Sequence, residues 1–347
     1  MVRRDSLVLT PDPWQIKEEN FPRLGTPEDQ LRYCLNYAVL APSSRNTQPW
    51  LFRMREGCVE LFADRTRRMP QLDPDGRWMV MSCGAALFHL RTALRHYGFA
   101  PRVRTFPDLE EVNLLSRVSP GASYEPTTQD HRLFQAITKR GTHRASFDDR
   151  PVPDAELDQL RAAVLAEGAV AHMVTNPEER HGLTQLIEEG QRWQAEQHAL
   201  QQELAVWAEE MRPQRDPPAT RWGAWKERRQ DEEPVRRVRR RDIEQAPVLV
   251  VLTSDRDNAV EWLQMGQAVD HLLLQAADYG LHASFLNAPL EVQALRTQVA
   301  HMLGTSRYPH IILRLGYAHH ADHTARRPVS ARMLPDTDSP SGFDPHA

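Results

Sequence analysis

The sequence predicts an α+β fold built from two similar halves, and two observations carry that prediction. Each half shows the same order of patterns: a helix, a strand, a long helix rich in small residues that ends at a Tyr-Gly pair, and a further strand. The two pairs are Tyr97-Gly98 and Tyr279-Gly280. In addition, the run APVLVVLT at 246–253 is an uninterrupted apolar strand, typical of the centre of a sheet. By length alone, the 347 residues would also allow one large α/β unit.

The first half begins with a helix, LRYCLNYAVLA, for which Thr26 supplies the N-cap and which Pro42 ends. Strands at 50–54 and 58–63 then form a hairpin. A strongly apolar helix at 78–99 follows, and we expect it to be buried. Its small residues would let another helix approach closely; these are Ser82, Gly84, Ala85 and Ala86.

The second half opens with helical patterns in 131–168, on either side of a basic turn. A stripe of apolar residues then predicts a long amphipathic helix, and we interpret the stripe as core packing. Its members are Leu186, Trp193, Leu200, Leu204, Trp207 and Met211. Residues 212–242 have the composition of a surface flap. After the apolar strand, we expect helices at 262–279 and 292–303 and a β-rich run at 310–317.

These patterns divide the chain into a first half at 1–125, a second half at 126–335 and a flexible polar tail at 336–347. A helical insertion at about 186–242 interrupts the second half. The boundary falls in PGASYEPTTQD, the best linker candidate within the Pro-, Ser- and Thr-rich stretch 100–130.

The composition argues against several classes of protein. A formal charge of −4 gives no electrostatic reason to expect nucleic acid or an anionic membrane as partner. Three widely spaced cysteines, Cys34, Cys58 and Cys83, support neither a disulfide framework nor a cysteine zinc site. No segment approaches the roughly 18 apolar residues of a membrane helix, and the start of the chain has no signal-like apolar run. We therefore expect a cytoplasmic protein.

The motif loop, APSSRNTQPW at 41–50, is the segment most informative about chemistry. A proline that stops a helix, two hydroxyl residues, an Asn and a Gln precede a Pro-Trp pair that enters a strand. Such a rigid, polar loop suits a planar ligand rich in heteroatoms. Taken alone, it could equally be an ordinary connection between a helix and a strand.

Two basic segments could bind phosphate. Arg140, Thr142 and Arg144 occupy alternate positions, so an extended backbone would turn all three to one side, where guanidinium forks match phosphate oxygens. A solvated basic turn explains the segment equally well. Near the end of the chain, Arg326 and Arg327 could supply a second pair of cations, or they could lie in an exposed loop.

Together these three segments resemble the FMN-dependent nitroreductase superfamily, in particular its Acg-like branch, in which two nitroreductase-like halves lie in one chain. The Arg-x-Ser-x-Arg motif of the superfamily is matched by Arg140, Thr142 and Arg144, with Thr in place of Ser. The motif Ala-Pro-Ser-x-x-Asn-x-Gln-Pro-Trp is matched by Ala41, Pro42, Ser43, Asn46, Gln48, Pro49 and Trp50. The resemblance extends over roughly residues 30–334 and includes the basic pair at 326–327.

The resemblance implies a nitroreductase-like fold in which the tandem halves form an intramolecular pseudo-dimer, with central mixed β-sheets wrapped by helices. The motif loop occurs only in the first half and RGTHR only in the second. One composite FMN site would therefore survive, and we expect about one FMN per chain. The pseudo-dimer would make the chain a monomer, or it could still pair as a homodimer.

The resemblance also implies roles for individual residues. Arg140, Thr142 and Arg144 would bind the FMN phosphate, and Arg326 or Arg327 would add positive charge. The ribityl chain or ring edge would be hydrogen-bonded by Ser43, Ser44, Asn46 and Gln48. A backbone N–H near 286–288 would contact flavin N5, where Asn287 stands at a place that is acidic in many members.

The function implied is an FMN-dependent oxidoreductase that passes electrons from NAD(P)H to a nitroaromatic, a quinone or a similar small acceptor in ping-pong fashion. The flavin does the chemistry, so no catalytic side chain is expected. An alternative is a flavin-sequestering protein with little turnover, in which the insertion, with Trp222 and Trp225, covers the site as a lid. A nucleic-acid-binding protein that uses the arginine run at 236–241 ranks third. We favour a lid or cofactor-edge role for that run, with Arg239 or Arg241 near the isoalloxazine.

Other candidate motifs are weaker. Neither a Gly-x-Gly-x-x-Gly fingerprint nor a P-loop is present. His319, His320 and His323 lie in a polar loop without acidic or cysteine partners, so we expect surface histidines and no metal site. Ser82-Cys83-Gly84 lacks the pattern of a nucleophile elbow and should serve packing.

Overall fold

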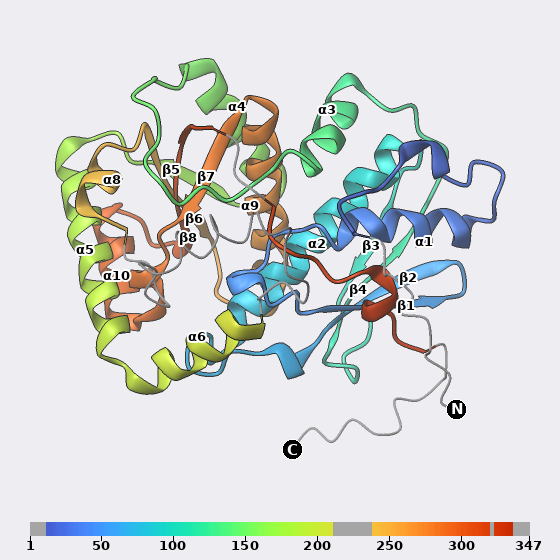
Figure 1. Cartoon of the computed structure of the whole chain (residues 1–347), viewed down its shortest axis with the longest axis horizontal. Helices are drawn as coiled ribbons and strands as arrows, with labels where there is room; N and C mark the ends of the chain where they lie inside the picture. The colour runs from blue at the N-terminus through green and yellow to red at the C-terminus, as the bar shows by residue number, and fades with distance from the viewer. Residues whose placement is uncertain (1–11, 211–237, 320–322, 336–347) are drawn as a thin grey trace, which may run out of the picture.

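The computed structural model describes residues 12–210, 238–319 and 323–335. Two sheets of four strands each lie on either side of a central pair of long helices, α2 (Arg77–His96) and α9 (Ala259–Asp278) (Figure 1). The predicted α+β fold is therefore confirmed.

The other elements follow in chain order. The first half contains η1 (Glu18–Asn20), α1 (Pro27–Ala38), η2 (Ser44–Asn46), β1 (Trp50–Arg55), β2 (Cys58–Ala63), η3 (Arg65–Arg67), β3 (Arg102–Thr105) and β4 (Leu114–Ser119). The second half contains α3 (Thr128–Ile137), α4 (Asp154–Ala166), β5 (Val170–Met173), α5 (Pro177–Glu196), α6 (His198–Glu210), α8 (Arg240–Glu244), β6 (Val248–Ser254), β7 (Leu281–Phe285), η4 (Ala288–Glu291), α10 (Gln293–Met302), β8 (Tyr308–Tyr317) and η5 (Val329–Arg332).

The two sheets repeat one order, β1-β2-β4-β3 and β5-β6-β8-β7, and all their named strands pair antiparallel. The mixed character expected of the sheets is limited to isolated parallel bridges, which join Phe52 to Met333 and Thr142 to Ala283. The first of these bridges brings the end of the second half onto β1, and Leu334 N donates to Phe52 O at 2.7 Å. Strands β3 and β4 lie within the stretch 100–130, where the repeated order of patterns predicts a further strand after Tyr97-Gly98 without giving its bounds.

Helix α1 begins at the N-cap residue that the sequence predicts, Thr26. The Thr26 hydroxyl accepts a hydrogen bond from Asp29 N at 3.2 Å, and the Asp29 carboxylate accepts one from Thr26 N at 2.9 Å. This reciprocal capping box satisfies two N–H groups that the helix leaves free. The chain then turns at 39–41, ahead of Pro42, and enters the motif loop.

Small residues let α2 and α9 pack at very short range, as the sequence predicted for α2. A Cβ atom at Gly266 would lie only 2.0 Å from the Met81 carbonyl oxygen and 2.8 Å from Gly84 Cα. The hydrophobic cores also cross this contact: Trp78 of α2 packs in the core of the second half, and Leu263 of α9 packs in that of the first. The contact between the two halves along α2 and α9 is therefore part of the hydrophobic core.

The predicted long amphipathic helix is two helices, α5 and α6, because the backbone turns to an extended conformation at Gln197. The interpretation of the stripe as core is confirmed where α6 is best buried. Leu200, Leu204 and Trp207 of α6 pack in one cluster with Met69 and other residues of the first half. Met211 and most of the predicted flap, including Trp222 and Trp225, lie outside the described residues, as does the predicted tail 336–347.

Candidate functional site

The motif loop is a strained turn that α2 holds in place. Arg45, Asn46 and Gln48 have φ values of +49°, +55° and +50°, a region that non-glycine residues rarely adopt. Ser82 of α2 accepts a hydrogen bond from Ser44 N at 3.1 Å, and the Ser43 hydroxyl accepts one from Gln48 N at 3.0 Å. Both predicted serines thus take part in shaping the loop. Backbone strain of this kind clusters at functional sites.

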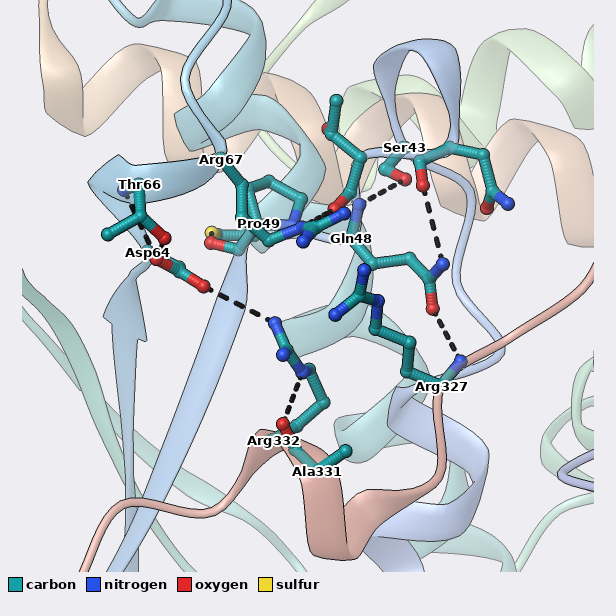
Figure 2. Close-up of polar contacts among 12 residues, drawn as sticks. Ser43, Gln48, Pro49, Asp64, Thr66, Arg67, Arg327, Ala331 and Arg332 are labelled. Carbon is teal, nitrogen blue, oxygen red and sulfur yellow. Dashed lines mark hydrogen bonds and ion pairs between the residues drawn. The ribbon is translucent and has the colours of Figure 1, made fainter. Parts of the chain in front are cut away.

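The amide side chains of the loop bind the end of the second half. Asn46 Nδ2 donates to Ala325 O at 3.0 Å, and Asn46 Oδ1 accepts from the Arg326 guanidinium at 2.9 Å. Gln48 Oε1 accepts from Arg327 N at 2.8 Å, as Figure 2 shows. These contacts join two predicted site segments that lie almost the whole chain apart, and they use amide groups that the sequence assigned to a ligand.

Arg140 and Arg326 lie side by side beneath the motif loop. They are 5% and 9% exposed, and both donate to the Leu40 carbonyl oxygen, at 3.4 and 3.3 Å. Arg140 Nε is buried without a hydrogen-bond partner. Burial lowers the pKa of Arg326, and the charge of Arg140 lowers it further. Two crowded guanidiniums with a buried donor that has no hydrogen-bond partner are an arrangement suited to an anion.

Arg327 diverges from its neighbour Arg326. Figure 2 shows its side chain between Gln48 and Arg332. Arg332 forms an ion pair with Asp64 at 3.3 Å, and its pKa is lowered first by burial and then by the charge of Arg327. Of the two predicted cations, the structure therefore brings Arg326 to Arg140 and directs Arg327 elsewhere.

The segment after Arg140 forms an isolated parallel bridge with β7, and its alternate side chains differ in surroundings. Thr142 bridges to Ala283 of β7, and His143 N donates to the Ala283 carbonyl oxygen at 2.9 Å. Arg144 is exposed, and its charge contributes to a lowered pKa of Arg45. Arg140, in contrast, is buried with Arg326.

Asn287 has a structural contact: its Oδ1 accepts from Ile312 N of β8 at 2.9 Å. The acidic side chain near this loop is Glu291, which the sequence analysis missed. Both of its carboxylate oxygens accept from Gln194 Nε2, at 2.5 and 2.6 Å. Burial raises the pKa of Glu291 to about 7, against the opposing charges of Arg45 and Arg77. The sequence does contain a signal for Glu291, because this acidic residue closely follows a strand and the loop after it.

The sequence analysis also missed two residues that form a pair in the structure. His89 of α2 and Asp270 of α9 lie on the sides of these helices that face each other. Both side chains are fully buried, and His89 Nε2 lies 3.0 Å from Asp270 Oδ2. The carbonyl oxygen of Tyr37 accepts from His89 Nδ1 at 2.9 Å. The charge of Asp270 opposes the lowering of the pKa of both Arg140 and Arg326. An Asp in the middle of the apolar helix pattern 262–279 was the signal for this buried acidic residue.

The structure also describes most of the other candidates. Arg239 and Arg241 are exposed at α8, where Arg241 Nε donates to Gln245 of its own helix at 2.9 Å. His323 stacks on Trp14 with ring centroids 4.0 Å apart, and His320 lies outside the described residues. The described ranges hold no group of three or more His, Cys, Asp or Glu residues that could bind a metal ion.

Cys83 is buried, as expected of a packing residue, and its thiol donates to Pro49 O. As for membrane insertion, the helices within the described ranges include none with the length and apolar character needed to span a bilayer.

Comparison with known proteins gives the family. The model of the nitroreductase family matches residues 137–317, just over half of the chain. Two proteins of Mycobacterium tuberculosis, both provisionally named NAD(P)H nitroreductases, are similar over most of their length. Rv3131 is 28% identical over 320 residues, which cover 89% of this chain and 88% of the relative. The acg protein is 28% identical over 316 residues, which cover 87% and 94%.

Among solved structures, a nitroreductase with bound FMN from Bacteroides fragilis is similar over 56% of this chain and 94% of its own, with 15% identity and a TM-score of 0.36. The resemblance that the three motifs predict is thus confirmed by the family match and by the relatives. The chain belongs to the nitroreductase family, and it is an oxidoreductase.

Proposed function

We propose that this chain binds one FMN between the motif loop of the first half and Arg140 of the second, and that it is an NAD(P)H-dependent reductase of small acceptors. The observation that carries the proposal is the pair of buried guanidiniums of Arg140 and Arg326 beside the strained loop. A buried, unused Arg140 Nε is the donor that a phosphate would satisfy. The residues present therefore fit the group.

The proposed roles follow the predicted sites. The phosphate is held by Arg140, Thr142 and Arg144, with charge added by Arg326 or Arg327. The ribityl chain and ring edge are held by Ser43, Ser44, Asn46 and Gln48, and the loop that carries Asn287 supplies a backbone N–H. When bound, FMN supplies the redox chemistry between NAD(P)H and an acceptor such as a nitroaromatic or a quinone.

The protein contributes position and charge. Hydrogen bonds between the 325–327 segment and the side chains of Asn46 and Gln48 join the motif loop to the end of the second half. Asp270 partly balances the two arginines, which reduces the cost of burying like charges before a phosphate binds. The names of the mycobacterial relatives support NAD(P)H as the electron donor.

A specific contact also favours the second candidate, a flavin-sequestering protein. Helix α6 belongs to the insertion but contacts the first half. Its Glu203 carboxylate accepts hydrogen bonds from Gln71 N at 3.1 Å and from Leu72 N at 3.0 Å. Trp207 of the same helix lies against Arg67, whose guanidinium is 5.0 Å from the indole ring. Arg67 Nε donates in turn to the Thr47 carbonyl oxygen of the motif loop. A helix tied to the loop in this way could restrict access to the site.

Phosphate binding by Arg140 and Arg326, the proposed phosphate clamp, is tested by comparing FMN with riboflavin, which lacks the phosphate. Hydrogen bonds to a charged group contribute about 1.5–3 kcal/mol. Arg140→Gln and Arg326→Gln should therefore each weaken FMN binding by roughly 10- to 100-fold and leave riboflavin binding unchanged. Arg161→Gln, an exposed arginine of α4, is the control and should change neither. Equal losses for FMN and riboflavin would contradict a phosphate clamp, and a protein that binds no flavin would refute the whole proposal.

Reduction separates the two candidate functions. Anaerobic bleaching of the bound flavin by NAD(P)H supports the reductase. A flavin that is inert to NAD(P)H but reduced by dithionite supports sequestration.

A further inference from the structure

Helices α2 and α9 present equivalent positions to each other where the two halves meet. Both helices are 20 residues long. Gly84 and Gly266 occupy the same position, counted from the start of each helix, and a Cβ atom at Gly266 would lie 2.8 Å from Gly84 Cα. By the same count, His89 of α2 corresponds to His271 of α9. The two helices can therefore be compared position by position on either side of their contact.

The two histidines differ in the side chain that faces them across this contact. His89 Nε2 lies 3.0 Å from Asp270 Oδ2 of α9, whereas the ring of His271 stacks on Phe88 of α2, with ring centroids 4.8 Å apart. Phe88 occupies in α2 the position that Asp270 occupies in α9. Because a phenylalanine satisfies core packing at this position, the aspartate at the equivalent position needs another explanation.

Asp270 also lacks the partners that the acidic residue near His271 has. That residue is Glu167, at the end of α4. Its Oε2 accepts from Arg91 Nη1 at 2.6 Å, and its Oε1 lies 3.6 Å from His271 Nδ1. Asp270 is fully buried, and within the described residues neither its carboxylate oxygens nor His89 Nε2 has a hydrogen-bond partner. A buried carboxylate without hydrogen bonds is unfavourable unless opposite charges lie close by.

The opposite charges are the two guanidiniums of the phosphate clamp, which the turn at the end of α1 joins to His89. The Tyr37 carbonyl oxygen accepts from His89 Nδ1 at 2.9 Å and from Leu40 N at 3.1 Å. The Leu40 carbonyl oxygen accepts from both guanidiniums, at 3.4 and 3.3 Å. His89 and the clamp therefore converge on one turn of the backbone, and Asp270 lies against His89. Burial lowers the pKa of both arginines, and the charge of Asp270 opposes this effect.

The buried charges of this cluster do not balance. Arg140 and Arg326 carry two positive charges, and Asp270 carries one negative charge. Within the described residues Arg140 Nε has no acceptor and the Asp270 carboxylate has no donor, so the carboxylate offsets charge without a hydrogen bond to the arginine. A phosphate group, with a charge of about −1.5 to −2 at pH 7, would supply both the missing charge and the missing acceptor. The same phosphate would repel Asp270.

We propose that Asp270 is a resident counter-ion of the phosphate clamp, which stabilises the flavin-free protein and weakens the binding of FMN. This inference rests on the proposed function and concerns how the affinity of that site is set. Asp270 is a positioning residue: it acts through the two arginines and needs no contact with the flavin. Removal of its charge should therefore tighten FMN binding, whereas removal of a ligand-binding group would weaken it.

The test is Asp270→Asn, which keeps the shape of the side chain and removes its charge. The Tm of the flavin-free protein should fall by about 4–7 °C, because two buried guanidiniums lose their counter-ion. FMN should bind about 10-fold more tightly than to the wild type, since the phosphate no longer meets a like charge. Riboflavin, which lacks the phosphate, should bind as before. Inorganic phosphate should raise the Tm of this variant more than that of the wild type.

Glu167→Gln is the matched control, because it exchanges an acid beside an arginine for an amide near His271, the counterpart of His89. This variant should lose stability with its ion pair and should leave the affinities for FMN and riboflavin unchanged. Weaker binding of FMN by Asp270→Asn, or an equal effect on FMN and riboflavin, overturns the inference.

A double-mutant cycle with Arg140→Gln gives an independent readout. With one of the two positive charges removed, Asp270→Asn should lower Tm by less than it does in the wild type, and the double variant should fold even where Asp270→Asn alone does not. Additive losses of Tm, or a double variant that does not fold, contradict a counter-ion. A chain that binds no flavin overturns the proposed function instead, and the Tm cycle still decides the role of Asp270.

Discussion

Replacing Gly266 with alanine should destabilise the protein strongly, although the same change usually stabilises a helix. Gly266 lies within α9, where it faces Met81 and Gly84 of α2. The added Cβ would come 2.0 Å from the Met81 carbonyl oxygen and 2.8 Å from Gly84 Cα. Both atoms belong to the backbone of a long helix, so no side chain can rotate away. The two central helices would have to separate.

The magnitude follows from two opposing effects. Alanine is favoured over glycine in a helix interior by about 1 kcal/mol. Overpacking a dense interior costs about 1–3 kcal/mol, and more where the backbone must move. Because this contact joins two helix backbones in the core, we expect an overpacking cost of about 3–5 kcal/mol and hence a net loss of roughly 2–4 kcal/mol. For a chain of 347 residues, that loss would lower Tm by roughly 3–5 °C.

Gly182 offers a matched control within a helix. It lies inside α5, and a Cβ there would meet Met302 Sδ at 3.5 Å, an ordinary contact with a flexible side chain. Gly182→Ala should therefore leave Tm unchanged or raise it slightly. Thermal unfolding of both variants, followed by circular dichroism and calorimetry, compares one chemical change at two places. A Gly266→Ala variant as stable as Gly182→Ala would show that the halves do not meet as described.

Further predictions concern charged and docking residues. Burial raises the pKa of Glu291 to about 7 from 4.5, so its contribution to stability is fully present below pH 4.5 and is lost as the pH rises through about 7. Glu291→Gln should flatten this part of the pH dependence in urea unfolding, and a curve parallel to the wild type would contradict the shift. The pH dependence of Glu60 has the opposite sign. Burial raises its pKa, but hydrogen bonds from Arg117 and Arg53 outweigh burial and lower it. The contribution of Glu60 to stability is therefore present above pH 4.5 and is lost in acid. Glu60→Gln should cost about 1–3 kcal/mol in urea unfolding at neutral pH, and the difference should shrink in acid; a constant difference would argue against the ion pairs. Trp207→Ala should loosen α6 and speed FMN dissociation in stopped-flow measurements if α6 restricts the site, whereas an unchanged rate would count against a lid.

Local hydrogen bonding explains why some predictions from sequence are confirmed. The N-cap at Thr26 depends on contacts within three residues, so its signal is complete in a short segment. The strand predicted at 246–253 is confirmed as β6, Val248–Ser254, because a short run rich in Val and bounded by turn residues suits a strand that is buried on both faces. The small residues of α2 predicted close helix packing, although they could not identify Gly266 as the partner.

Errors arose where distant contacts overrode a local pattern. One continuous amphipathic stripe predicted one helix, yet the chain bends at Gln197, and α6 then docks on Gln71 and Leu72 of the first half. Other contacts had no signal in the sequence: the Asn287 side chain accepts a hydrogen bond from Ile312 N of the neighbouring strand. Glu291 has an unusual environment only because Gln194 and two arginines from the first half surround it.

The sequence by itself determined the family, the α+β class and the residue types of the proposed phosphate and flavin site, because motifs and hydrophobic periods are contained in short segments. Only the tertiary structure decided how those residues group. It brings Arg326 beside Arg140, and it gives the Gln48 side chain the backbone N–H of Arg327 as a partner. These outcomes depend on burial and on contacts between residues far apart in the chain, and such contacts exist only once the two halves have packed along α2 and α9.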